Sequence, residues 1–173
     1  MGVACVRNEA DALECWARYN LRLLDELQVI DHVSDDRTGW VLQQLQAEGL
    51  PLVVHRVDDP SDRQAATMNQ VARQVAARPG VGFVLPLDAD ELLALPDRAA
   101  LHAVLARIPP GCAGAMRWRT YLPAAADHLP DQPFFRRMVR FRSHAHPSLD
   151  KLVLPAALCA SHAWTAGAHN ALH

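Results

Sequence analysis

The sequence predicts an α/β fold, an open and mostly parallel sheet flanked by helices, with a mixed β region in the C-terminal third. Short apolar runs of strand length alternate four times with segments whose apolar residues recur at helical spacing. Polar clusters follow three of the expected strands, and after residue 110 short extended runs lie between proline-rich loops. Alternating strands and helices are typical of a parallel sheet, in which ligands bind at the carboxyl ends of the strands.

Four strand-and-helix units account for the first 110 residues. The expected strands cover residues 3–6, 27–33, 52–55 and 81–87. The helices that follow them carry their apolar residues within 13–24, 41–49, 68–75 and 101–108. Residues 61–64 match a capping box ahead of the third helix. Because residues 81–87 are nearly all apolar, we expect this strand in the interior of the sheet, with helices covering both faces.

The last third of the chain has a different pattern. Its extended runs cover residues 115–122, 134–141, 152–154 and 158–164, and no further long helix is expected. A length of 173 residues fits one domain, at roughly 100 to 200 residues per domain. We therefore expect a single domain over residues 1–173.

Composition and charge exclude several classes of protein. Seventeen basic and nineteen acidic side chains give a formal net charge of -2, which argues against binding of nucleic acid through its phosphates. No apolar run reaches the roughly 18 residues that a membrane span needs. The four cysteines form no CxxC pair, so neither a zinc ribbon nor a disulfide framework is expected, and no signal-peptide pattern is present. We therefore expect a cytoplasmic protein.

Three polar clusters carry the strongest functional signal. They are Arg7, Asn8 and Glu9 after the first expected strand, residues 31–36 around the end of the second, and Asp88, Asp90 and Glu91 after the fourth. A single aspartate after a strand is often only a helix cap or a turn former. Three clusters weaken that interpretation, because the carboxyl ends of parallel strands meet at one edge of the sheet.

Asp88 and Asp90 form a DxD motif directly after an apolar strand. Two carboxylates this close repel each other unless a cation or solvent separates them. Mg²⁺ and Mn²⁺ prefer oxygen ligands and are commonly held by one or two carboxylates together with substrate phosphates. The pair therefore predicts Mn²⁺ or Mg²⁺ as cofactor and a nucleoside diphosphate as ligand. DxD also opens haloacid-dehalogenase phosphatase sites, but there it lies near the chain start, whereas here it follows the fourth expected strand.

Three segments in order resemble the family 2 glycosyltransferases of the GT-A fold, in particular the branch that begins with VRNE. The first segment is VRNE at residues 6–9 with Glu14, Trp16 and Tyr19, and with Asn20 where the family usually has histidine. The second, residues 31–38, is similar to the family's DNGSTDGT loop but lacks the customary asparagine and both glycine-like positions. The third, residues 84–91, is similar to its VxFLDADEF segment.

This resemblance covers about residues 3–93 and is patchy afterwards, although 151–155 and 161–162 resemble a later family segment. It implies a metal-dependent transferase that moves a sugar from a nucleoside diphosphate sugar to an unknown acceptor (a glycan, lipid or small molecule), with inversion. It also implies a GT-A-like domain in which residues 1–110 bind the nucleotide sugar and residues 111–173 face the acceptor.

The resemblance also implies roles for individual residues. Substrate binding is assigned to Arg7, Asn8, Glu9, Asp31, Asp36, Asn69, Asp88 and Lys151. Within that set, Asp31 binds the base, Asp36 lies near the ribose or diphosphate, and Asn69 shapes the donor pocket. Asp88 contacts the ribose or sugar, and Asp90 ligates the metal. A metal at this position stabilises the charge on the departing diphosphate without moving a proton.

The catalytic base and a second metal ligand are less well defined. An inverting transfer needs a carboxylate that takes the proton of the acceptor hydroxyl, and the candidates are Glu91, Asp127, Asp131 and Asp150, with Glu91 and Asp150 preferred. Asp127 and Asp131 sit in a proline-rich loop typical of solvated surface. His162 is the candidate second metal ligand, because it follows an expected strand and imidazole suits Mn²⁺. The alternative is that His162 is a hydrogen-bonded surface residue.

Two alternatives stay open. Trp118, next to Arg117 and Arg119, either faces an acceptor or packs against the core. The chain is short for the family and lacks a clear base, so the alternative function is an inactive or truncated protein that still binds a nucleotide sugar.

Overall fold

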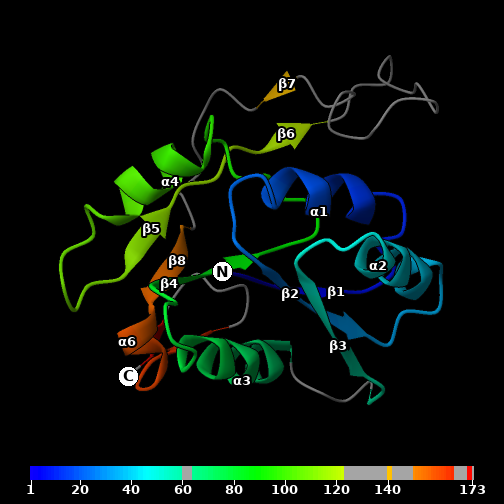
Figure 1. The fold of residues 1–173 in the computed structure, drawn as a ribbon, viewed down its shortest axis with the longest axis horizontal. Helices are drawn as coiled ribbons and strands as arrows, with labels where there is room; N and C mark the ends of the chain where they lie inside the picture. Colours follow the sequence, from blue (N-terminus) through cyan, green and yellow to red (C-terminus); the bar gives the residue numbers. More distant parts are fainter. Residues whose placement is uncertain (60–63, 123–139, 142–149, 166–170, 173) are drawn as a thin grey trace.

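The computed structural model describes residues 1–59, 64–122, 140–141, 150–165 and 171–172. Its main element is a six-stranded sheet with the order β3-β2-β1-β4-β8-β5 (Figure 1). The strands are β1 (Gly2–Val6), β2 (Leu27–His32), β3 (Leu52–Val57), β4 (Phe83–Leu87), β5 (Gly114–Met116) and β8 (Lys151–Pro155). The first four are parallel, whereas β8 runs antiparallel to both β4 and β5. The predicted open, mostly parallel α/β sheet is therefore confirmed.

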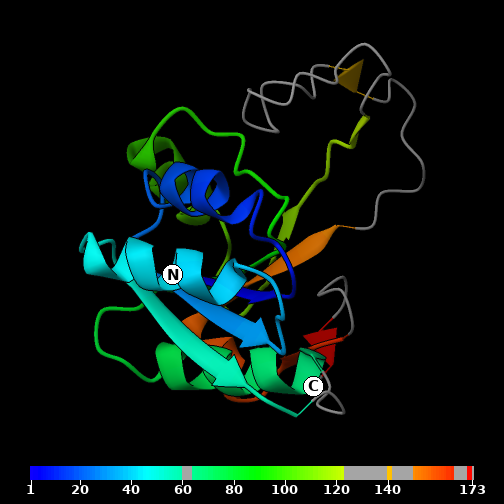
Figure 2. The same ribbon diagram turned by 90° about the vertical axis from the view of Figure 1, so that its right-hand side faces the viewer.

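Helices cover both faces of this sheet. They are α1 (Leu13–Asn20), α2 (Thr38–Ala47), α3 (Gln64–Ala76), α4 (Arg98–Leu105) and the short α6 (Ala156–Cys159). Figure 1 shows α1, α2 and α4 on one side and α3 and α6 on the other, and Figure 2 shows α3 below the sheet with α1 and α2 above it. Each face has its own apolar core, and β4 contributes Leu85 to one and Val84 to the other. The prediction that this strand is interior is confirmed.

Helix boundaries follow local chemistry. Asp97 caps α4, because its carboxylate accepts a hydrogen bond from the Ala100 N–H at 2.8 Å. The helix ends at Leu105, so Ile108 lies beyond it although the apolar spacing extended that far. Likewise α1 ends at Asn20, and Leu24 lies after a turn over residues 21–23 rather than in the helix.

The C-terminal third differs from the prediction in two places. The expected run over residues 115–122 is divided between β5 and β6 (Tyr121–Leu122), and β6 pairs with β7 (Arg140–Phe141). The expected extended run over 158–164 is wrong in its first part, which belongs to α6; only β9 (Ala163–Trp164) is extended, paired with β10 (Ala171–Leu172). Proline suits a helix start and alanine favours helix, and here a proline and two alanines precede Leu158.

Some predictions fall outside the described residues. These are the capping-box residues 61–63, the candidate bases Asp127 and Asp131, and the expected run over residues 134–139. In the part of the chain that the structure describes, no helix is both long enough and apolar enough to cross a membrane.

Candidate functional site

A polar pocket of about 530 Å³ lies at the carboxyl ends of β1, β2 and β4. It is lined by Cys5, Val6, Arg7, Glu9, His32, Gln64, Asp88, Ala89 and Asp90. Each of the three polar clusters found in the sequence contributes to this lining. The topology therefore brings them together at one edge of the sheet, where parallel α/β proteins bind ligands.

Hydrogen bonds join the loop after β1 to the loop after β2. The Asn8 N–H donates to Ser34 Oγ at 3.1 Å, and Asn8 Oδ1 accepts from the Asp35 N–H at 2.9 Å. The Glu9 N–H donates to Thr38 Oγ1 at 2.8 Å. Asn8 therefore holds the two loops together rather than lining the pocket itself.

Both of these loops carry a left-handed backbone residue. Among the described residues, Asn8 and Val33 are the non-glycine residues with positive φ, at 57° and 55°. Asparagine tolerates this region, but a β-branched valine is strained there. Val33 stands at a glycine-like position of the family segment, and its N–H donates to the Val57 carbonyl at 3.0 Å. Backbone strain thus gathers beside the polar pocket.

Carboxylate repulsion dominates the electrostatics of the pocket. Burial raises the pKa of Glu9, and the negative charges of Asp90, Asp11, Asp36 and Asp88 raise it further. Arg7 is the one arginine or lysine among the described residues that line the pocket. A cation between these carboxylates would relieve their repulsion.

The donor set fits a hard divalent cation only in part. Asp88 and Asp90 offer oxygen ligands of the kind that Mg²⁺ and Mn²⁺ prefer. Within the described residues, however, no group of three or more His, Cys, Asp and Glu side chains is placed to hold a metal. Such a cation would therefore take its other ligand oxygens from water or from a diphosphate. His162 does not line the pocket, its Nδ1 lies 2.9 Å from Ser161 Oγ, and its metal role stays a prediction.

Lys151 lies beside the pocket and pairs with two carboxylates, of which Asp88 lines the pocket and Glu91 does not. Its Nζ is 2.8 Å from Asp88 Oδ2 and 2.7 Å from Glu91 Oε2, and it lies 5.5 Å from the centroid of the Trp118 ring. Glu91 Oε2 also accepts from the Asp88 N–H at 2.9 Å. Burial raises the pKa of Glu91, and the nearby Lys151 ammonium opposes that rise.

Two candidate residues have a buried carboxylate oxygen with no hydrogen-bond partner among the described residues. These atoms are Asp31 Oδ1, at the end of β2, and Asp150 Oδ1, directly before β8. Asp31 is only 2% exposed, and a side chain at Gly39 would approach its Oδ2 to 3.4 Å. Buried acceptors are normally satisfied, so the donors to these two oxygens lie outside the described residues or on a ligand.

Two other predicted substrate residues have structural partners. Asp36 accepts from the Thr38 N–H at 2.8 Å and from the Ala10 N–H at 3.3 Å, which shapes the start of α2. Asn69 is buried on α3, where its amide donates to the Trp164 carbonyl and accepts from the Trp164 N–H, both at 2.8 Å. The structure does not bring Asn69 into the pocket lining, because both ends of its amide bind the backbone of β9.

Three residues that shape this site were not among the predicted site residues. His32 and Gln64 line the pocket, the first at the last position of β2 and the second at the first position of α3. Asn20, fully buried, donates to the Glu91 carbonyl at 3.0 Å and accepts from the Leu93 N–H at 3.1 Å. The rule that polar residues at strand ends reach one edge could have found His32, whereas the Asn20 contact joins residues 71 apart.

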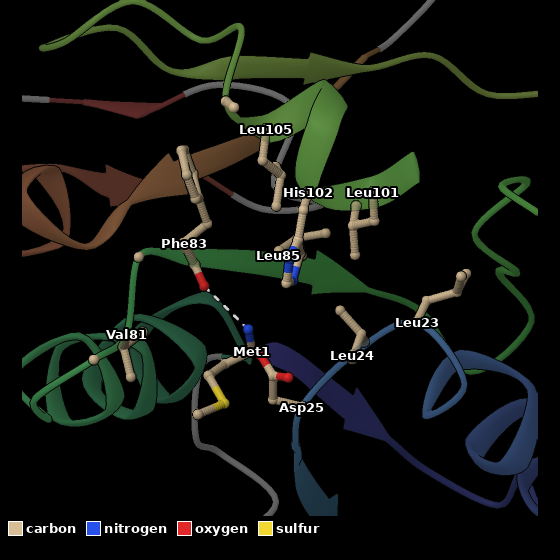
Figure 3. A pocket seen from close by; sticks show the side chains of 13 residues that line it. Met1, Leu23, Leu24, Asp25, Val81, Phe83, Leu85, Leu101, His102 and Leu105 are labelled. Atoms are coloured by element: carbon tan, nitrogen blue, oxygen red, sulfur yellow. Dashed lines mark hydrogen bonds between the residues drawn. The ribbon is translucent and has the colours of Figure 1, made fainter. Parts of the chain in front are cut away.

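A second pocket, of about 280 Å³, lies at the amino ends of the same strands (Figure 3). In Figure 3, Leu101, His102 and Leu105 of α4 lie opposite Leu85 of β4 and Leu24. The other lining residues are Met1, Leu23, Asp25, Gly80, Val81, Gly82, Phe83 and Ala106. None of the residues predicted to bind substrate or metal lines it.

Comparison with known proteins gives structural similarity alone. No protein-family model matches the chain, and no curated protein matches it. The fold is similar to that of S. aureus TarS 1-349 in complex with UDP, with 22% identity, a TM-score of 0.43, and coverage of 61% of this chain and 30% of the other. It is also similar to 4-diphosphocytidyl-2C-methyl-D-erythritol synthase, with 11% identity, a TM-score of 0.48, and coverage of 91% and 76%. The chain thus spans under a third of that TarS chain.

Proposed function

We propose that this chain is a metal-dependent glycosyltransferase that moves a sugar from a nucleoside diphosphate to an acceptor hydroxyl, with inversion. The observation that carries the proposal is the meeting of Arg7, Glu9, Asp88 and Asp90 around one pocket at the carboxyl edge of parallel strands. The resemblance of residues 3–93 to the VRNE branch of family 2 glycosyltransferases supports the same function.

The charges of the pocket suit a diphosphate only in company with a cation. Asp88 and Asp90 repel a bare diphosphate, whereas Arg7 alone offsets only one negative charge. Asp88 and Asp90 would hold Mg²⁺ or Mn²⁺, and a cation there would supply positive charge that stabilises the departing diphosphate. Asp90 is exposed and is the first proposed protein ligand of the cation, Asp88 is the second, and Arg7 is the proposed phosphate contact.

The nucleoside end of the donor is assigned to Asp31. Its buried Oδ1, which has no partner in the part of the chain that the structure describes, can accept a hydrogen bond from a base N–H. Asn8 and Asp36 support this end by fixing the two loops around it.

The proposed base is Asp150. Glu91 Oε2 is bound by Lys151 and by the Asp88 N–H, whereas Asp150 Oδ1 has no partner among the described residues. In the transfer, the acceptor oxygen forms a bond to the anomeric carbon while its proton passes to the carboxylate. The bond from that carbon to the phosphate oxygen breaks, and the nucleoside diphosphate leaves with the electron pair.

Calorimetric titration of UDP and GDP, with Mn²⁺ and with a chelator, tests this function. We expect metal-dependent binding of at least one nucleotide, weakened at least about 100-fold in Asp90→Ala, because even outer partners of a metal cost 10- to 100-fold. Asp25→Ala is the matched control, since it removes an exposed aspartate at the opposite pocket. Absence of binding under every metal condition would leave the chain without a transferase donor site.

A further inference from the structure

The chain's single lysine is fully enclosed beside the polar pocket. Lys151 is 1% exposed, and its Nζ contacts Asp88 at 2.8 Å and Glu91 at 2.7 Å. Strand pairing explains how it arrives there. β8 pairs antiparallel with β4, Phe83 opposite Pro155 and Val84 opposite Leu154, and the same register continued places Lys151 opposite Leu87. Lys151 therefore lies next to Asp88, the first residue of the DxD motif.

Burial and contacts argue against direct ligand binding by Lys151. An ammonium has three N–H donors, and here two carboxylates accept from it while the Trp118 ring covers it at 5.5 Å from the centroid. Asp88, by contrast, is 41% exposed and lines the pocket. The lysine thus touches the pocket only through Asp88.

We propose that Lys151 is a positioning residue for the cation site: it binds Asp88 Oδ2 and so fixes where the other Asp88 oxygen points. This inference rests on the proposed function for its consequence in catalysis. The ammonium also offsets one of the three negative charges of Asp88, Asp90 and Glu91, which leaves a net charge of -2 for the group. A divalent cation bound there would neutralise that remainder.

A buried ion pair can also serve the fold alone, so the test needs a charge-matched variant. Lys151→Met by itself leaves the partly buried Glu91 without its cationic partner, and such a variant is expected to be destabilised. Lys151→Met combined with Glu91→Gln removes one positive and one negative charge. The net charge of the group then stays at -2, Asp88 loses its ammonium partner, and the amide oxygen of the new glutamine can still accept from the Asp88 N–H.

Mn²⁺ binding, measured by electron paramagnetic resonance without nucleotide, reports on Asp88 directly. We expect the double variant to keep a cooperative unfolding transition and to bind Mn²⁺ about tenfold more weakly than the wild type. Lys151→Arg, which keeps a cation in place, should recover most of that affinity. A folded double variant with wild-type Mn²⁺ affinity would overturn the inference, as would a wild-type protein that does not bind Mn²⁺.

The single lysine also provides a spectroscopic signature. Selective ¹⁵N-lysine labelling yields one side-chain ammonium resonance, which we expect to be visible because burial slows its exchange with water. Substoichiometric Mn²⁺ should broaden it, and Asp88→Asn should shift it. A resonance that neither Mn²⁺ nor Asp88→Asn alters would contradict the positioning role. Because these measurements need no nucleotide, failure of UDP or GDP to bind would refute the proposed function separately.

Discussion

The two pockets lie at opposite ends of the same parallel strands and differ in chemistry. At the carboxyl edge, carboxylates and an arginine surround a cavity of about 530 Å³, and Asp31 and Asp150 each have a buried oxygen without a partner among the described residues. At the amino edge, leucines from α4 and β4 surround a cavity of about 280 Å³. The comparison shows that strand direction separates ligand binding from core packing. The loops that follow the strands carry polar groups, whereas the loops that precede them carry apolar residues that pack against the core.

Backbone strain shows the same division. The left-handed residues at the carboxyl edge are Asn8 and Val33, whereas Gly80, which lines the amino-edge pocket, adopts φ 84° without a side chain. Glycine reaches this region at no steric cost, but valine does not. Strain is therefore retained beside the polar pocket and avoided at the apolar one.

The largest expected effect is a loss of stability from a substitution at the amino edge. Leu24 is 2% exposed and lines the apolar pocket. Leu24→Ala should lower the free energy of unfolding by about 3 kcal/mol, because the lost contacts leave a cavity. Urea unfolding measures the change, and titration of Mn²⁺ with UDP should give wild-type affinity for the folded fraction. A loss of affinity would show that the two edges are coupled.

Two buried asparagines, Asn20 and Asn69, allow an effect on stability to be distinguished from an effect on ligand binding. Asn20→Ala removes the hydrogen bonds to Glu91 and Leu93, and Asn69→Ala removes those to Trp164. Each should cost about 2 kcal/mol of unfolding free energy, since buried backbone groups lose their partners. Only Asn20→Ala should also weaken metal-dependent UDP binding, because it frees the segment after β4. Equal affinities in the two variants would exclude this role for Asn20.

Relief of backbone strain is expected to stabilise the carboxyl edge. Val33→Asn should raise the free energy of unfolding by about 1 kcal/mol, because asparagine tolerates the left-handed region that valine resists. Val53→Asn is the control: Val53 lies in β3, where asparagine is disfavoured, so that change should destabilise. Thermal unfolding of both variants measures the difference, and a destabilised Val33→Asn would mean that side-chain packing outweighs the strain.

The smallest effect depends on pH. Burial lowers the pKa of His55 from its ordinary value of 6.5, and its Nε2 lies 2.7 Å from Gln28 Oε1. The unfolded chain therefore binds the proton more readily than the folded one, and stability is lost as pH falls below 6.5. Urea unfolding at about pH 7.5 and about pH 5.5 should show a loss below about 1 kcal/mol that His55→Gln reduces. An unchanged loss in that variant would assign the effect to other groups.

Local pattern was sufficient for most of the fold. The apolar runs that became β1 to β4 and the periodic segments that became α1 to α4 depend on burial of one strand face or helix face, which sequence spacing records directly. The same spacing predicted an extended run where the structure has α6 after Pro155, because a helix of four residues is too short to show a period. It also extended α4 to Ile108, since apolar residues beyond a helix can still pack against the core.

The sequence by itself determined the strand-end clusters, the DxD pair and the edge at which they meet. Tertiary structure alone decided which partners those side chains have. Lys151 binds Glu91 across 60 residues of chain, and Asn69 binds Trp164 across 95. Such contacts depend on strand order and on the antiparallel register of β8, and no local spacing encodes either. A residue type therefore predicted chemistry, but the fold decided whether that chemistry faces a ligand or a neighbouring side chain.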